Sequence, residues 1–353
     1  MPQTVELFAP LRQPHQLFEN ILMKILFGIQ GTGNGHISRA REIVPLLQQY
    51  GEVDLLVSGT EAEVSLSQPL KYRFHGVSFV FGTNGGVDNW ATWKIMNLRQ
   101  FQRDLRSLPL KNYDLIINDF EPVSAWACKL RGVPSVSLSH QCSFVSPNTP
   151  RPEKKDPFAQ WLLKNYSPTT YHVGFHFERY DSFINTPVIR SEIRQMETSN
   201  LGHYTVYLPA YDDKTLVKYL SQTRDVKWQV FSKRQKQAYV AGNVEVFPVN
   251  NEAFNKSLAS CEGLLTGGGF EGPAEALFLQ KKVMMIPMKG QYEQQCNALS
   301  ASKLGVPVVK VIDEQFPMHL NNWIHDGKKI IVDFPDETAQ IVDRMVKQYA
   351  KIV

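Results

Sequence analysis

The sequence has few cysteines and no long apolar run, and these absences limit what it can encode. Its four cysteines show neither a C-x-x-C pair nor the spacing of metal ligands, so buried free thiols in a reducing compartment are expected at Cys128, Cys142, Cys261 and Cys296. No stretch of 18 apolar residues occurs, so no membrane-spanning helix is expected. The net charge of +4 over 353 residues is mild and does not argue for a nucleic-acid partner.

The N-terminus also lacks the pattern of a secretory signal. Residues 1–22 have no basic start followed by an apolar core, and we predict an irregular N-terminal extension. Met23 then opens an apolar run that resembles the natural start of a domain. A cytoplasmic protein is therefore expected.

The glycine-rich segment at residues 28–36 lacks two features of common nucleotide-binding loops. Gly31 and Gly33 fit the first glycines of G-x-G-x-x-G, but His36 stands at the third position, and the next strand ends without an acidic residue. The Gly-Lys-Ser/Thr ending of a Walker loop is absent as well. No Asp-x-Asp pair occurs, and neither a metal nor another cofactor is expected.

Short β-branched and aromatic runs alternate with amphipathic stretches, which is typical of α/β folds with parallel sheets. Strands are expected at 24–29, 53–58, 72–79, 113–119, 134–139 and 171–177, and then at 204–208, 226–231, 244–247, 261–266 and 283–287. We therefore predict two Rossmann-like parallel-sheet domains that face each other across a cleft. The predicted parts are the extension (1–22), a first domain (23–185), a linker (186–200), a second domain (201–333) and a C-terminal helix (334–353) that returns to the first domain.

Two residues at strand ends in the first half could form an acid–base pair. His36 lies in the first turn of a predicted helix, where an imidazole at a cleft rim can act as a general base. Asp119 ends a buried strand, at the carboxyl edge where parallel sheets place ligands, and could orient the imidazole. The alternatives are a capping or packing role for His36 and a helix-capping role for Asp119.

A second constellation occupies residues 264–298. A buried strand ends at Thr266, three glycines follow, and a helix begins, so that backbone amides at its N-terminus could bind an anion. Glu275 inside that helix could accept hydrogen bonds from ribose hydroxyls. The polar segment 291–297 carries the carboxylate and amide groups that recognise sugar hydroxyls.

With these motifs the chain resembles the GT-B glycosyltransferases, in the group of the UDP-glycosyltransferases and the bacterial lipid-linked N-acetylglucosaminyltransferase. The resemblance implies metal-independent, inverting transfer of a sugar from a nucleotide diphosphate sugar, UDP-linked by preference, to an acceptor hydroxyl. It implies that the first domain (23–185) is the acceptor-side domain and the second (201–333) the nucleotide-sugar donor domain. It also implies that His36, after Gly35, is the base and that Asp119, before Phe120, orients it. It assigns the donor phosphates to Gly267, Gly268, Gly269, Phe270, Ala210 and Tyr211, the ribose to Glu275, the donor sugar to Glu293, Gln294 and Asn297, and the nucleobase to Phe247 and Val249.

The acceptor side is predicted at Gly35, Trp90, Trp93, His140 and Gln141. Residues 82–106 mix tryptophans and aliphatic residues with lysine and arginine. One interpretation is an amphipathic lip that meets a lipid-linked or otherwise hydrophobic acceptor, with peripheral contact at the inner membrane face. The other is an ordinary helix with a solvated basic face.

The chain departs from the family pattern at the second glycine turn. Gly267 replaces a histidine that often precedes the glycine pair, and Glu271 and Gly272 replace small hydroxyl residues. A glutamate at a helix N-terminus suits the helix dipole but repels a diphosphate. Two alternative functions on this fold are a nucleotide-sugar epimerase and a non-catalytic sugar- or nucleotide-binding protein.

Overall fold

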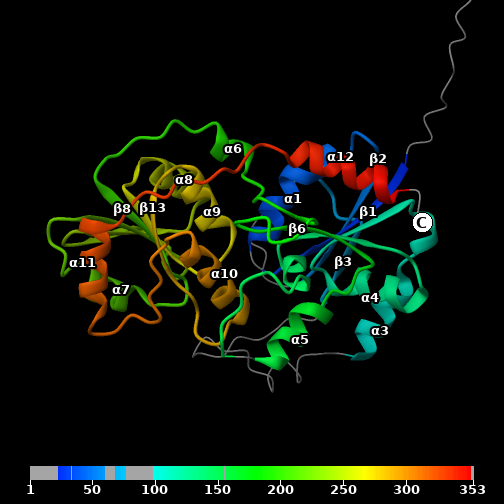
Figure 1. Cartoon of the computed structure of the whole chain (residues 1–353), viewed down its shortest axis with the longest axis horizontal. Helices are drawn as coiled ribbons and strands as arrows, with labels where there is room; N and C mark the ends of the chain where they lie inside the picture. The colour runs from blue at the N-terminus through cyan, green and yellow to red at the C-terminus, as the bar shows by residue number, and fades with distance from the viewer. Residues whose placement is uncertain (1–22, 33, 60–67, 77–97, 155, 351–353) are drawn as a thin grey trace, which may run out of the picture.

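The computed structural model describes residues 23–32, 34–59, 68–76, 98–154 and 156–350, which form two α/β domains side by side (Figure 1). The first domain is built on a parallel sheet in the order β3-β2-β1-β4-β5-β6-β7. Its strands are β1 (Met23–Gln30), β2 (Gly51–Ser58), β3 (Tyr72–Phe74), β4 (Leu115–Asp119), β5 (Val136–Ser139), β6 (Tyr171–Phe175) and β7 (Ile184–Asn185).

The second domain is built on a sheet in the order β10-β11-β9-β8-β12-β13, in which only the β10–β11 pair is antiparallel among the described strands. Its strands are β8 (His203–Tyr207), β9 (Lys227–Ser232), β10 (Tyr239–Ala241), β11 (Val244–Pro248), β12 (Gly263–Gly267) and β13 (Lys282–Ile286). The predicted pair of parallel-sheet domains is thereby confirmed.

The crossovers between parallel strands are helical. In the first domain they are α1 (Asn34–Leu47), α3 (Leu98–Ser107), α4 (Pro122–Arg131) and α5 (Pro157–Asn165), with the 3-10 turns η1 (Leu110–Asn112) and η2 (Gln141–Val145). In the second domain they are α7 (Asp213–Leu220), α8 (Asn251–Ser260) and α9 (Glu271–Phe278). The short α6 (Ser191–Arg194) lies between the two sheets, and α10 (Tyr292–Lys303) and α11 (Phe316–Asp326) follow the last strand. The apolar face of α1, with Ile37, Ala40 and Val44, is buried as its spacing predicts.

The chain returns to the first domain at its C-terminal end. After α11 it runs back across the molecule, and α12 (Thr338–Tyr349) packs against α1 (Figure 1). The Tyr50 hydroxyl donates to Asp343 Oδ1 at 2.7 Å, and the rings of Tyr171 and Tyr349 stack with centroids 4.6 Å apart. The last helix therefore ties the two domains together.

Three details differ from or complete the sequence predictions. The strand expected at 72–79 already ends at Phe74, and residues from 77 on lie outside the described ranges. The predicted linker 186–200 contains the single turn α6, and the last strand of the first sheet, β7, ends just before it. All four cysteines are free and buried, as predicted. Within the described ranges no helix is long and apolar enough to cross a membrane.

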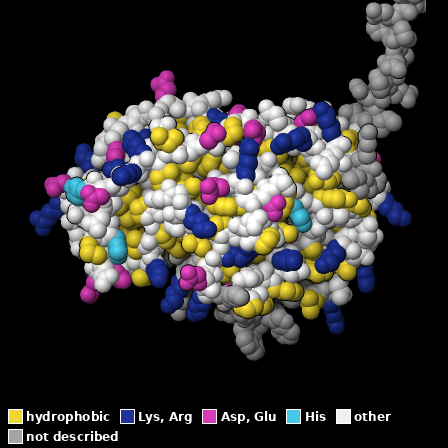
Figure 2. Space-filling model, viewed as in Figure 1, with side chains coloured by type: hydrophobic (Ala, Val, Ile, Leu, Met, Phe, Trp, Pro, Cys, Tyr) yellow, Lys and Arg dark blue, Asp and Glu magenta, His cyan; other side chains and the backbone are white. Residues whose placement is uncertain are grey.

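Lysine and arginine side chains are spread over both domains on the face shown in Figure 2, with acidic side chains between them. This mixture agrees with the mild net charge of +4.

Candidate active site

Each sheet has a point at which the strand order reverses, and such points form crevices at the carboxyl ends of the strands. In the first sheet the reversal lies between β1 and β4, where Ile29 pairs with Asp119. In the second it lies between β8 and β12, where Thr266 pairs with Tyr207. His36 and Asp119 follow the first pair of strands, and the glycine turn 267–269 follows β12.

The structure brings His36 and Asp119 into direct contact. His36 Nδ1 lies 2.8 Å from Asp119 Oδ1, and the carboxylate is fully buried. Because an ionised carboxylate can only accept, Nδ1 is the donor in this bond, and in the neutral imidazole Nε2 then carries the lone pair. This arrangement is compatible with the predicted base, which would accept a proton at Nε2.

A buried cation joins this pair, and the sequence analysis missed it. Arg39 lies one turn after His36 on α1, and its Nη2 donates to Asp119 Oδ1 and Oδ2 at 2.7 and 2.9 Å while Nε donates to Oδ2 at 3.1 Å. Burial alone would raise the pKa of Asp119, but the charges of Arg39 and His36 hold it below its usual value. The i, i+3 spacing of His36 and Arg39 is the signal that could have revealed it.

Asp119 is not a helix cap, which resolves one of the alternatives. Glu121 occupies the N-cap of α4, and its carboxylate accepts from the backbone N–H groups of Val123 and Ser124 at 2.6 Å each. With the cap supplied by Glu121, both oxygens of Asp119 are available to Arg39 and His36.

Gln141 connects Nε2 of His36 to the second domain. Its Nε2 lies 3.5 Å from His36 Nε2 and donates to Glu293 Oε1 at 3.0 Å. Its Oε1 is buried and has no hydrogen-bond partner among the described residues. The Gln141 amide therefore bridges His36 and the loop 291–297 and keeps one acceptor atom unused among the described residues.

The predicted donor-sugar residues Gln294 and Asn297 hold the glycine turn in place. Gln294 Oε1 accepts from the backbone N–H groups of Gly268 and Met288 at 3.0 and 2.9 Å, and Asn297 Nδ2 donates to Gly268 O at 3.1 Å. A Cβ on Gly268 would lie 2.6 Å from Gln294 Cβ, so only glycine fits there. The loop at 291–297 and the glycine turn therefore form one unit.

His140, predicted on the acceptor side, lies inside the contact between the domains. Its Nδ1 is 2.8 Å from Phe175 O, its Nε2 is 2.8 Å from Asn297 Oδ1, and its ring stacks on Phe270 with centroids 3.8 Å apart. Burial lowers the pKa of His140. Both ring nitrogens lie against oxygen atoms of the protein, and a neutral imidazole donates to only one of them. An acceptor role stays a prediction that needs one of these contacts to open.

Glu275, predicted to bind ribose, is buried in an ion pair. Arg190, from the segment before α6, donates from Nε to Glu275 Oε1 at 2.5 Å and from Nη2 to Oε2 at 2.8 Å. Arg190 is a second buried cation that the sequence analysis did not single out. The ribose role stays a prediction, and a hydroxyl would have to share the carboxylate with Arg190.

The remaining predicted residues lie at the second sheet or outside the described ranges. Ala210 is exposed, whereas Tyr211 accepts from the Ile312 N–H at 3.3 Å and packs against the core. Phe247 and Val249 are half-buried at the end of β11 and just beyond it. Trp90 and Trp93 lie outside the described residues, so the structure does not bear on the predicted lip, and in the part of that segment that is described Leu98–Ser107 is helical.

Comparison with known proteins decides the family. The family model of glycosyl transferase family 1 matches residues 23–324. The chain belongs to this family. It is therefore a glycosyltransferase, as the sequence predicts, and sugar transfer is the activity to which the contacts between the two domains have to be related.

Solved structures agree at the level of the fold. A UDP-glucosyltransferase from Polygonum tinctorium superposes with a TM-score of 0.58 at 13% identity, covering 93% of this chain and 94% of that one. A glycotransferase of kitacinnamycin gives 0.56 at 15%, with 93% and 95% covered, and MurG of Acinetobacter baumannii gives 0.53 at 15%, with 93% and 99% covered. No curated protein matches the chain. At these identities the likeness shows the GT-B fold and no more.

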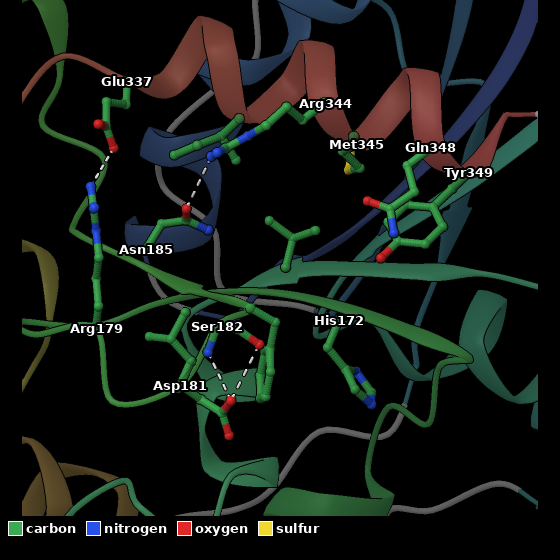
Figure 3. Close-up of a pocket in the computed structure, with 14 residues that line it drawn as sticks. His172, Arg179, Asp181, Ser182, Asn185, Glu337, Arg344, Met345, Gln348 and Tyr349 are labelled. Carbon is green, nitrogen blue, oxygen red and sulfur yellow. Dashed lines mark hydrogen bonds and ion pairs between the residues drawn. The ribbon is translucent and has the colours of Figure 1, made fainter.

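A separate cavity of about 720 Å³ lies between the edge of the first sheet and α12, away from the glycosyltransferase motifs (Figure 3). The Arg179–Glu337 ion pair lies at one end of this cavity. Arg344 from α12 donates to Asn185 Oδ1 of β7 at 3.4 Å. Neither His36 nor the glycine turn lines this cavity.

Within the described ranges no group of three His, Cys, Asp or Glu residues could hold a metal ion.

Buried histidines make the stability of this glycosyltransferase sensitive to acid. Burial lowers the pKa of His140, His172 and His203, and that of His176 falls well below 6.5. Below about pH 6.5 the unfolded chain binds protons that the folded chain does not, so the free energy of unfolding falls as pH drops. Urea denaturation at pH 7.5 and 5.5 is expected to show this loss, and His176→Phe is expected to reduce it by up to about 1.4 kcal/mol per pH unit.

The neighbouring substitution Phe177→Leu serves as the control for this experiment. It removes volume from the same cluster, in which the rings of His176 and Phe177 lie 5.5 Å apart, but it removes no titrating group. It should lower stability at both pH values equally. An unchanged pH slope in His176→Phe would contradict the assignment.

Proposed function

We propose that the protein transfers a sugar from a nucleoside diphosphate sugar, with UDP as the preferred nucleotide, to an acceptor hydroxyl with inversion at the anomeric carbon. The observation that carries the proposal is the His36–Asp119 pair at 2.8 Å, at the reversal point of one sheet and next to the glycine turn of the other. The choice of UDP follows the resemblance of the sequence motifs to those of the UDP-glycosyltransferases. Family membership favours transfer over epimerisation and over binding without turnover.

In the proposed mechanism His36 Nε2 takes the proton of the acceptor hydroxyl, and the acceptor oxygen forms a bond to the anomeric carbon. The bond from that carbon to the diphosphate breaks on the opposite face, and its electron pair stays on the diphosphate oxygen. Asp119 holds the imidazole through Nδ1 and stabilises the imidazolium. Backbone N–H groups of the turn 267–270 and the start of α9 stabilise the leaving group, without a metal or another cofactor.

The donor contacts of the proposal follow the sequence motifs. Glu275 binds the ribose, Glu293 meets the transferred sugar, and Phe247 and Val249 flank the base. Glu293 is the best placed of these, because its carboxylate is held by Gln141 beside His36 and is half-exposed. Gln141 then contributes its spare Oε1 to the acceptor hydroxyl.

The proposal is tested by the thermal stability of the protein with UDP, dTDP, GDP and ADP, with uridine and inorganic phosphate as controls. A ligand at a hundred times its dissociation constant adds about 2.7 kcal/mol to the free energy of unfolding. UDP is expected to stabilise the protein most, and the controls only weakly. If another of these nucleoside diphosphates stabilised the protein more than UDP, that nucleotide would take the place of UDP in the proposal. No effect from any of the four would contradict a nucleoside diphosphate donor.

A further inference from the structure

Arg39 holds two carboxylates from opposite domains, and they differ in how well they are shielded. Asp119 is fully buried, whereas the side chain of Glu271 is 27% exposed. Arg39 Nη1 donates to Glu271 Oε1, and Nη2 and Nε donate to Asp119. Asp119 is therefore the permanent partner of the guanidinium, and Glu271 is a partner that solvent or a ligand can replace.

Glu271 stands between the His36–Asp119 pair and the glycine turn. It is the first residue of α9 and follows the turn 267–270 to which the proposed function assigns the diphosphate. A Cβ on Gly35 would lie 2.7 Å from Glu271 Oε2, so glycine at that position admits the carboxylate to the start of α1. The carboxylate is thus an anion next to the place where the proposed function puts the anionic part of the donor.

The charges of this cluster do not allow a diphosphate to be added without a change. Arg39 carries one positive charge, and Asp119 and Glu271 together carry two negative charges, which leaves the cluster negative before a donor arrives. A diphosphate beside it would repel Glu271 strongly in this partly buried setting. If Glu271 turned outward, Arg39 and Asp119 alone would be neutral.

We propose that Arg39 changes partners when the donor binds: Glu271 releases the guanidinium, and the diphosphate takes the freed N–H group while Asp119 stays bound. This inference rests on the proposed function, because it takes the donor to be a nucleoside diphosphate sugar. It makes Arg39 a donor-binding residue supplied by the acceptor-side domain and Glu271 a competitor of the donor.

The exchange also connects donor binding to the base. Arg39 Nη2 lies 3.1 Å from His36 Nδ1, so a phosphate bound to the guanidinium would lie close to the imidazole. Asp119, which contacts Nδ1, and Glu293, which is held by Gln141, are the acidic groups nearest to His36. The exchange therefore brings the donor next to the residue that takes the acceptor proton in the proposed mechanism.

The test is the affinity for UDP, measured by calorimetry with the full-length protein. Glu271→Gln keeps the shape of the side chain but removes the competing charge, and it is expected to lower the dissociation constant of UDP about five- to tenfold. Arg39→Lys keeps a buried cation but loses the planar fork, and it is expected to raise that constant about tenfold. In the Arg39→Lys background the gain from Glu271→Gln should shrink to about twofold or less, because the two residues act on one contact.

Two controls isolate the diphosphate. UMP lacks the second phosphate, and its affinity should respond less to either substitution than that of UDP. Glu337→Gln removes another arginine-paired glutamate at a helix start, and should leave UDP binding unchanged. Glu337 pairs with Arg179 and lines the cavity beside α12, to which no donor residue is assigned. Circular dichroism verifies that each variant is folded.

The outcomes separate this inference from the proposed function. If the wild type binds UDP and Glu271→Gln binds it equally or more weakly, the partner exchange is wrong and the donor proposal stands. If the folded wild type and the variants all fail to bind every nucleoside diphosphate, both proposals are wrong. Equal gains for UMP and UDP would show that Glu271 does not compete with the diphosphate.

Discussion

Replacing His36 with asparagine is expected to lower kcat by about two to four orders of magnitude while the dissociation constant of UDP changes by less than about twofold. In the wild type His36 Nδ1 lies 2.8 Å from Asp119 Oδ1, and an asparagine amide can replace it as the donor to this carboxylate. The amide cannot take a proton from an acceptor hydroxyl. The groups assigned to the donor lie on the glycine turn and α9, and the substitution leaves them intact. Steady-state kinetics with the donor and acceptor that give transfer, together with calorimetry for UDP, measure both quantities.

His172→Asn is the matched control for this substitution. His172 is a histidine of the same domain, but it lines the cavity beside α12 rather than the contact between the domains (Figure 3). Neither kcat nor UDP affinity should change. If His36→Asn lost UDP binding in a folded protein, His36 would be a donor or structural residue, and an unchanged kcat would place the base elsewhere.

The strands could be predicted because buried parallel strands carry their signal in their own residues. Residues 25–27 of β1 are fully buried, and the apolar run at 24–29 is visible in the sequence. The short strand β10 has no such signal, since Tyr239 is 38% exposed and Val240 is 70% exposed. It forms because its backbone pairs with β11, and that pairing depends on a neighbour rather than on its own composition.

The site residues within each domain could be predicted from the sequence, but the contact between the two domains could not. His36 and Asp119 each follow a strand, and parallel strands bring their carboxyl ends to one edge, so their meeting follows from topology. The Arg39–Glu271 ion pair joins residues 232 positions apart and depends on how the two domains close. From the sequence, Glu271 is predicted only to repel a diphosphate. Its partner Arg39 lies in the other domain, so the ion pair cannot be predicted from the residues near Glu271.

Replacing Asp119 with asparagine is expected to lower the free energy of unfolding by about 3–5 kcal/mol. Asp119 is fully buried and accepts from Arg39 and His36. The substitution therefore leaves the buried Arg39 guanidinium without the negative charge of Asp119. Because its pKa is held below the usual value, this stabilisation is fully present above about pH 4 and is lost as pH falls through the folded-state pKa. Urea denaturation at pH 7 measures the difference, and Glu252→Gln, which breaks an exposed pair with Lys256, should cost about 1 kcal/mol or less.

The same substitution tests whether Asp119 acts through His36. An asparagine that turns its N–H toward Nδ1 would leave the imidazole proton on Nε2, the nitrogen that has to accept, so kcat should fall by at least about a hundredfold. If the two residues form one functional unit, the double variant His36→Asn with Asp119→Asn should have nearly the kcat of His36→Asn alone. If the kcat losses of the two single variants multiply in the double variant, Asp119 acts on catalysis independently of His36. Its contribution would then run through Arg39 rather than through the imidazole.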